Sequence, residues 1–136
     1  MGTRSLTFVY DGDVPVINIY RQYDGYPSGH GHELAQFLDS KTLVNGFGKQ
    51  NSFEANGMGC LAAQLIVQLK HGVGGIYIYP VSSTDCFQDY EYHVYEDKVI
   101  VYHDFPYEGN RYDQEPLFEG TWEEFSQFCL DPISAE

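Results

Sequence analysis

Two histidines, an arginine and two tyrosines crowd into residues 21–38, RQYDGYPSGHGHELAQFL. His30 and His32 are one residue apart, as two ligands of a metal ion can be, and Asp24 adds a carboxylate. The same segment has three glycines ahead of a helical pattern, and backbone N–H groups in such a turn can hold a phosphate at the helix N-terminus. A glycine-rich turn that only starts a helix explains the segment equally well, because it needs no ligand.

We favour a small phosphorylated ligand as the partner of this segment. Arginine suits bidentate contacts with phosphate, and tyrosine rings can stack on a base. The segment matches neither the GxxxxGK[ST] nor the GxGxxG pattern, so it identifies no known phosphate loop. The predicted ligand-binding residues are Arg4, Arg21, Tyr23, Tyr26, Gly29, His30, Gly31, His32 and Arg111.

The histidines do not form a convincing metal site. His30 and His32 flank a glycine at a turn-to-helix junction, where their rings need not converge. A two-residue turn between the later strands pairs His93 with Tyr102, and His93 and His103 then point to opposite faces of the sheet. The chain has neither HExxH nor paired CxxC motifs. We therefore expect no metal ion and no cofactor.

No residue stands out as a catalytic nucleophile. Cys60 opens a predicted helix, where the helix dipole can lower the pKa of a thiol, but it lies beside a wide apolar face and is expected to be buried. The chain is therefore predicted to bind its ligand without catalysis. The alternative is a small phosphodiester hydrolase, with His30, His32 and acids such as Asp24 as bases or ligands.

The composition sets the class of protein and its partners. The 136 residues, 43% of them hydrophobic, predict one globular domain spanning residues 1–136. A net charge of −13 disfavours long nucleic acids and anionic membranes as partners. It leaves open a third function, an acidic interaction protein that blocks a basic host protein. Three widely spaced cysteines, and no apolar run near about 18 residues, predict a cytoplasmic protein.

Hydrophobic periodicity predicts an α+β fold, with a mainly antiparallel sheet and helices on one face. The expected order is β-β-α-α-β-β-β-α. A DGD turn joins the first two strands into a hairpin, Ser28 is a candidate N-cap of the first helix, and Thr121 with Glu124 forms a capping box for the last. Residues 104–116 form a long loop, expected to be a lid or a subunit contact.

Four motifs extend over nearly the whole chain: MGTRS at the start, DGYPSGHGHEL at 24–34, NGMGCLAAQ at 56–64 and GGIYIYP at 74–80. Together they resemble a widespread family of small phage and bacterial proteins, and among these the viral anti-CBASS sponge proteins. Such sponges sequester cyclic-oligonucleotide immune signals without cleaving them and assemble as oligomers. The resemblance implies a homo-oligomer that traps a cyclic nucleotide in the host cytoplasm during phage counter-defence. It assigns no individual residue, so the nine binding residues rest on their chemistry.

Overall fold

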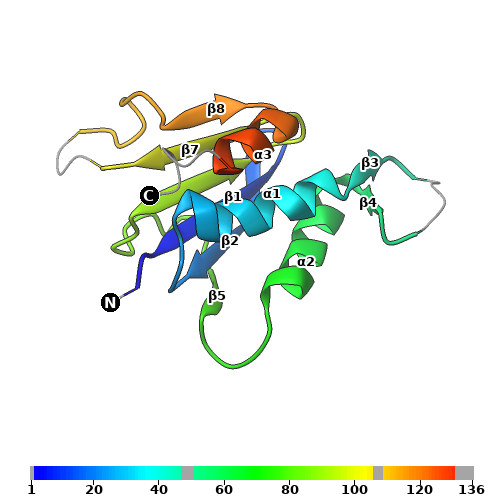
Figure 1. Ribbon diagram of the computed structural model, residues 1–136, viewed down its shortest axis with the longest axis horizontal. Helices are drawn as coiled ribbons and strands as arrows, with labels where there is room; N and C mark the ends of the chain where they lie inside the picture. The colour runs from blue at the N-terminus through cyan, green and yellow to red at the C-terminus, as the bar shows by residue number, and fades with distance from the viewer. Residues whose placement is uncertain (1, 47–50, 106–108, 131–136) are drawn as a thin grey trace.

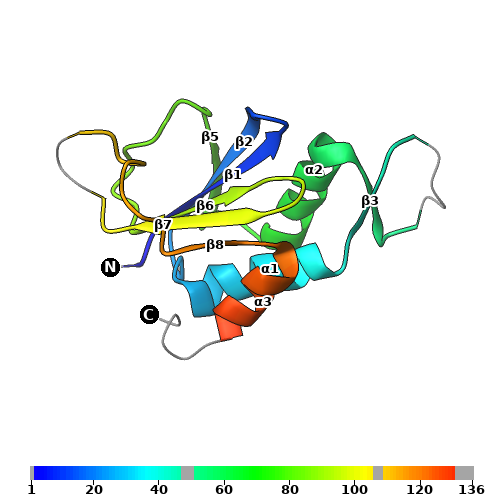
Figure 2. The same ribbon diagram turned by 90° about the horizontal axis from the view of Figure 1, so that it is seen from above.

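The computed structural model describes residues 2–46, 51–105 and 109–130, and it has the predicted α+β architecture. A six-stranded sheet in the order β5-β2-β1-β6-β7-β8 carries the helices on one face (Figures 1 and 2). The strands are β1 (Ser5–Asp11), β2 (Val14–Arg21), β5 (Ile76–Tyr79), β6 (Tyr90–Val94), β7 (Val99–His103) and β8 (Phe118–Gly120). Only β1 and β6 pair in parallel; the other neighbours in this sheet are antiparallel.

The predicted N-terminal hairpin is confirmed. β1 and β2 meet in a tight turn whose Gly12 has φ +63°, a conformation that favours glycine. A bulge between Val9 and Tyr10 shifts the register, so that Tyr10 pairs with Pro15.

The helices begin and end near their predicted positions. A short π-helix, η1 (Pro27–Gly31), leads into α1 (His32–Asp39), and α2 (Gly57–Leu69) and α3 (Trp122–Leu130) follow. The capping box is confirmed: the Thr121 N–H donates to Glu124 Oε1 at 2.8 Å and the Glu124 N–H to Thr121 Oγ1 at 3.1 Å. Ser28 is not the N-cap, because η1 begins after Tyr26 and has no side-chain cap. Asp131–Pro132 predicts the end of the last helix, and these two residues lie outside the described residues.

Alternation along the strands gives the sheet two different faces. On the face that carries the helices, Val9 and Ile19 pack with residues of all three α-helices in the main core. On the opposite face, Leu6, Phe8 and Tyr20 form a second, smaller cluster. We call this second side the open face, because none of the described helices covers it (Figure 2). Glu91 and His93 lie there, since they pair with Leu6 and Phe8.

Two further local predictions were wrong. The β6–β7 register pairs His93 with Ile100, not Tyr102, because the turn is centred one residue earlier, on Glu96 and Asp97, where the Tyr95 N–H donates to the Lys98 carbonyl at 2.9 Å. The shift is two residues, so His93 and His103 still point to opposite faces. Cys60 is half-buried and not fully buried.

Three short strands were not predicted. A parallel pair, β3 (Thr42–Val44) and β4 (Glu54–Asn56), flanks the segment read as a loop, and β8 adds to the edge of the main sheet beside β7. Each has three residues, too few to show an alternating pattern.

The glycines of the 21–38 segment permit close packing. A Cβ on Gly25 would lie 2.8 Å from the Arg4 carbonyl carbon and 2.9 Å from Ser5 N, at the start of β1. A Cβ on Gly29 would lie 2.5 Å from the Asp24 carbonyl oxygen. Larger side chains at these positions would push η1 away from the sheet.

This packing predicts opposite effects for two Gly→Ala substitutions. Gly25→Ala forces a backbone displacement and should lower the free energy of unfolding by about 1–3 kcal/mol. Gly59→Ala should raise it by up to about 1 kcal/mol, because Gly59 is exposed in α2 with nothing within 4 Å of the added Cβ. Chemical denaturation measures both, and a Gly25→Ala protein as stable as wild type would contradict the packing argument.

Candidate ligand-binding cavity

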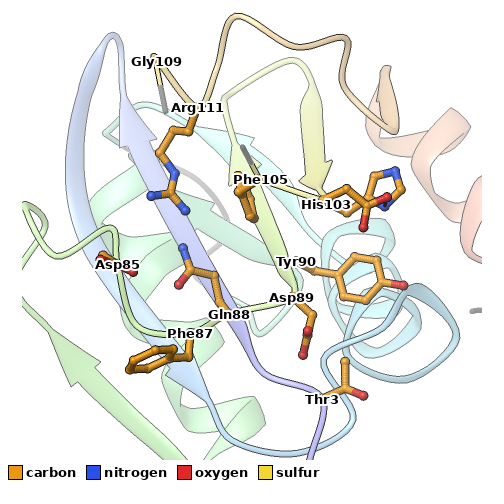
Figure 3. Close-up of a pocket in the computed structure, with 11 residues that line it drawn as sticks. Thr3, Asp85, Phe87, Gln88, Asp89, Tyr90, His103, Phe105, Gly109 and Arg111 are labelled. Atoms are coloured by element: carbon orange, nitrogen blue, oxygen red, sulfur yellow. Dashed lines mark ion pairs between the residues drawn. The ribbon is translucent and has the colours of Figure 1, made fainter. Parts of the chain in front are cut away.

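A polar cavity lies where β6 begins and β7 ends. Its volume is about 740 Å³, within the range that small-molecule sites occupy. Arg111 and Gln88 stand on one side of it and Tyr90 and His103 on the other (Figure 3). The lining residues are Thr3, Asp85, Phe87, Gln88, Asp89, Tyr90, His103, Asp104, Phe105, Gly109 and Arg111.

Two lining residues have a backbone conformation that side chains rarely adopt. Phe87 has φ +57° and Asp104 has φ +53°. Phe87 is also 83% exposed, so its ring gains no burial that would offset this strain. Unfavourable backbone conformations of this kind collect at ligand sites, where the surrounding structure maintains them.

Arg111 is held in place by a carboxylate and an aromatic ring. Its Nη2 lies 2.9 Å from Glu91 Oε2, and its guanidinium carbon lies 4.3 Å from the centre of the Phe105 ring. Its Nε is buried and has no hydrogen-bond partner within the described residues. Arg111 therefore places a positive charge, with donors to spare, at the wall of the cavity.

Glu91 is a fully buried carboxylate beneath the cavity. Besides Arg111, the Gln88 amide donates to it at 2.7 Å, the Tyr112 hydroxyl donates at 2.8 Å, and His93 Nε2 lies 3.0 Å away. Burial alone would raise the pKa of Glu91, but the hydrogen bonds from His93, Gln88 and Tyr112 outweigh burial and lower it. Glu91 is therefore ionised at neutral pH.

The polar network continues across the open face. His93 Nδ1 lies 2.6 Å from the Tyr10 hydroxyl, and Tyr10 stacks on Tyr95 with ring centres 4.3 Å apart. Burial raises the pKa of Tyr10, so its hydroxyl keeps its proton. Arg111, Glu91, His93 and Tyr10 thus form one chain of polar contacts from the cavity to the bulge of β1. We call these four residues the Glu91 network.

His103 and Asp104 form a second polar pair, directly in the cavity wall. His103 Nδ1 lies 3.0 Å from Asp104 Oδ2, and the imidazole stacks on Tyr90 with ring centres 6.1 Å apart. A carboxylate at one ring nitrogen orients a histidine and leaves the other nitrogen for a ligand or a proton transfer.

The 21–38 segment forms its own closed set of contacts on the helix-covered face. Arg21 Nη1 makes an ion pair with Glu33, and Arg21 Nε donates to the Tyr23 carbonyl at 2.7 Å. The N–H groups proposed to hold phosphate donate within the chain: Gly29 and Gly31 to Tyr26, His30 to Asp24, and His32 to Gly29. These donors are therefore occupied in the conformation described.

His30 lies inside this set and is fully buried. Its Nε2 lies 2.6 Å from Thr7 Oγ1 and its Nδ1 lies 3.3 Å from Arg21 Nη1. Burial, assisted by the Arg21 charge, lowers the pKa of His30 to about 3, so the ring is neutral at pH 7. In this environment His30 joins η1 to β1.

The structure separates the nine predicted ligand-binding residues. Arg111 lines the cavity, and Arg4 adjoins it through its main chain, whose N–H donates to Asp89 Oδ2 at 3.1 Å. Arg21 lies on the other face of the sheet, and Tyr26 donates its hydroxyl to Asp24 at 3.2 Å. Tyr23 and His32 do not line the cavity either. The predicted loop 104–116 does contribute, through its described residues Asp104, Phe105, Gly109 and Arg111.

Sequence reasoning missed most of the cavity wall. Residues 85–89 carried no periodic or motif signal, and nothing in residue type indicates a positive φ at Phe87. The unusual length of the 104–116 loop was the one usable signal, and described residues of this loop line the cavity.

The comparisons with known proteins give no relative: no family model, no curated protein and no solved structure matches the chain. In the described part of the chain, no helix is long and apolar enough to cross a membrane. Within residues 2–46, 51–105 and 109–130, no three His, Cys, Asp or Glu side chains are grouped to hold a metal ion.

The lowered pKa of Glu91 predicts how its contribution depends on pH. The contribution of Glu91 to the free energy of unfolding is fully present above pH 4.5, the ordinary pKa of a glutamate side chain. It is lost as the pH falls through the lower pKa that Glu91 has in the folded state. Glu91→Gln should lower the free energy of unfolding by about 3 kcal/mol at pH 7. Urea titrations from pH 7 to below pH 4.5 measure the free energy of unfolding, and its difference from wild type should shrink below pH 4.5.

The matched control is Glu119→Gln. The Glu119 side chain is half-exposed and lies 3.7 Å from Lys98, so its loss should change stability by less than about 1 kcal/mol. Equal effects of the two substitutions would show that the Glu91 network contributes no more than a surface ion pair.

Proposed function

We propose that the protein binds a small nucleotide-like ligand in the cavity and does not cleave it. The observation that carries this proposal is the exposed ring of Phe87, on a backbone of positive φ, at the cavity that Arg111 lines. An aromatic platform next to a fixed guanidinium matches a base joined to a phosphodiester. The 21–38 segment, whose donors are occupied, then supports the sheet and is not the ligand site.

The other lining residues suit the sugar and base of such a ligand. Asp89 and Asp104 offer carboxylate oxygens to hydroxyl or amino groups, and Gln88 offers an amide. Sites that combine a few fixed polar groups with aromatic surface select ligands by shape and hydrogen bonding.

The charges in the cavity limit the phosphate content of the ligand. Three aspartates, Asp85, Asp89 and Asp104, line it, and the charge of Arg111 is partly balanced by Glu91. A phosphodiester carries one negative charge and can be held by one arginine, whereas a triphosphate or a long nucleic acid would be repelled. A cyclic dinucleotide carries two such charges, fewer than a triphosphate, and Arg111 would hold one of its two phosphodiesters. The homo-oligomeric state, the cytoplasmic location and the role in phage counter-defence are further parts of the proposal that rest on the sequence resemblance.

The ligand proposal predicts a thermal shift with cyclic mono- and oligonucleotides. A ligand at 100 times its dissociation constant adds about 2.7 kcal/mol of stability. Phe87→Ala should weaken binding by about ten- to a hundredfold, because it removes a stacking platform without opening a core cavity. Phe53→Ala is the matched control, since Phe53 is 64% exposed and does not line the cavity. No shift with any cyclic nucleotide, or equal affinities of both variants, would contradict the proposal.

The His103–Asp104 pair favours a second candidate, a phosphodiester hydrolase. An imidazole oriented by a carboxylate in a cavity wall can act as a general base towards water. The two functions differ in whether the ligand is recovered intact.

If the protein is a hydrolase, incubation with a cyclic dinucleotide should yield linear products by chromatography. His103→Gln should then lower kcat by about a hundredfold or more, because the base is lost. If the protein only binds the nucleotide, the nucleotide is recovered unchanged after incubation with wild type and with His103→Gln. Product formed equally by wild type and His103→Gln would exclude the pair as its source.

A further inference from the structure

The acidic residues are distributed very unevenly along the chain. All 20 aspartates and glutamates lie outside residues 55–84, a stretch of 30 residues that includes α2 and β5. Lys70 is the single Lys or Arg in this stretch. It therefore provides an almost uncharged surface on a chain of net charge −13.

Helix α2 is apolar over most of its surface, including a side that is exposed, and Gln64 and Gln68 are its only polar side chains. Met58, Leu61 and Leu65 are buried against the sheet, as an amphipathic helix would require. The outer side, however, presents Ala63 and Val67, and Val67 is 78% exposed. Helices with apolar residues on most sides are normally buried, so the exposed outer side of α2 is suited to contact with another surface.

Strand β5 forms the adjacent edge of the sheet and is uncharged. The Gln22 N–H donates to the Gly75 carbonyl. Hydrogen-bonded and non-hydrogen-bonded residue pairs alternate along antiparallel strands. The main-chain groups of Tyr77 therefore face β2, and those of Ile76 and Ile78 face outward. Ile76 is occupied, because its N–H donates to Gly74 and its carbonyl accepts from Lys70 Nζ at 2.8 Å. The outward N–H and C=O of Ile78 remain for a further strand.

The two features form one continuous surface. Lys70 follows the last residue of α2, and its side chain reaches β5. Three residues on the same side of the helix, at three, four and seven positions before Lys70, continue the surface from the β5 edge: Val67, Ile66 and Ala63. Ile78, which is 55% exposed, lies in β5, and Val81, which is 42% exposed, follows two residues after the strand ends. We call the surface formed by Ala63, Ile66, Val67, Ile78 and Val81 the acid-free surface.

We propose that the acid-free surface binds a second copy of this chain, forming a two-fold symmetric dimer. Two molecules that each carry −13 repel one another, so they can associate most readily through the part of the surface that lacks acidic residues. A basic protein would instead be attracted to the acidic surface, and nucleic acids or anionic membranes would be repelled by the whole molecule.

The register of the dimer follows from the free groups of Ile78. Across a two-fold axis, the two Ile78 residues exchange both N–H···O=C bonds, and Tyr77 of one copy faces Tyr79 of the other on the open face. The two sheets then continue into one, and the two α2 helices approach each other on the helix-covered face. Aromatic pairs of this kind stabilise strand pairing.

The test is sedimentation velocity over roughly a hundredfold range of protein concentration. Wild type should sediment as a dimer at the upper concentrations. Val67→Glu and Ile78→Glu should each raise the dissociation constant by roughly a hundredfold or more, since they bury an unpaired charge in the interface. Val14→Glu is the matched control, because Val14 is 64% exposed but lies in β2, outside the acid-free surface, and should leave the dimer unchanged.

Circular dichroism establishes that each variant is folded, and the exposure of all three positions keeps the substitutions compatible with the fold. Wild type that stays monomeric throughout the range would overturn the proposal. A dimer that persists in both Val67→Glu and Ile78→Glu would overturn it too, by placing the interface elsewhere. The result is independent of ligand binding, since Phe87→Ala should leave the dimer intact.

Discussion

A single buried carboxylate organises the side of the sheet that no helix covers. An ionised glutamate without access to water is unfavourable unless donors surround it, and Glu91 has donors from Gln88, Tyr112 and Arg111, with His93 at its other side. These donors come from β6, from the segment before β6 and from the loop after β7. The loops around the cavity are therefore positioned by the need to satisfy one charge.

The same requirement explains how a small domain maintains an open cavity with an arginine in its wall. The guanidinium is fixed from below by Glu91 and from the side by Phe105, so little conformational entropy remains to be lost when a ligand binds. The Arg21–Glu33 pair, on the other face, contacts His30 and so supports η1 and the start of α1. Of these two arginines, one supports the fold and the other is available to a ligand.

Local sequence signals predicted the fold better than the site. The hairpin and the Thr121–Glu124 capping box follow from neighbouring residues, and the structure has both. The prediction that His93 and His103 point to opposite faces was correct although the predicted register was wrong. The register differed by two residues, and an even shift keeps each side chain on its face. The ion pair of Arg21 with Glu33 was not predicted, because Glu33 lies on a helix that follows the turn, beyond any spacing rule. The cavity depends on the backbone of Phe87 and Asp104, which residue type does not reveal.

The parallel pairing of β1 with β6 has a consequence for how the chain folds. Ser5 and Tyr90 are neighbours in the sheet, so the centre of the sheet closes a loop of more than half the chain. Contacts of such long range raise the contact order, and high contact order slows folding. During synthesis the N-terminal hairpin emerges early, with the inner edge of β1 unpaired until β6 has been made. That edge is then the part of the nascent chain most exposed to mispairing, and a chaperone that shields it would speed the recovery of native protein.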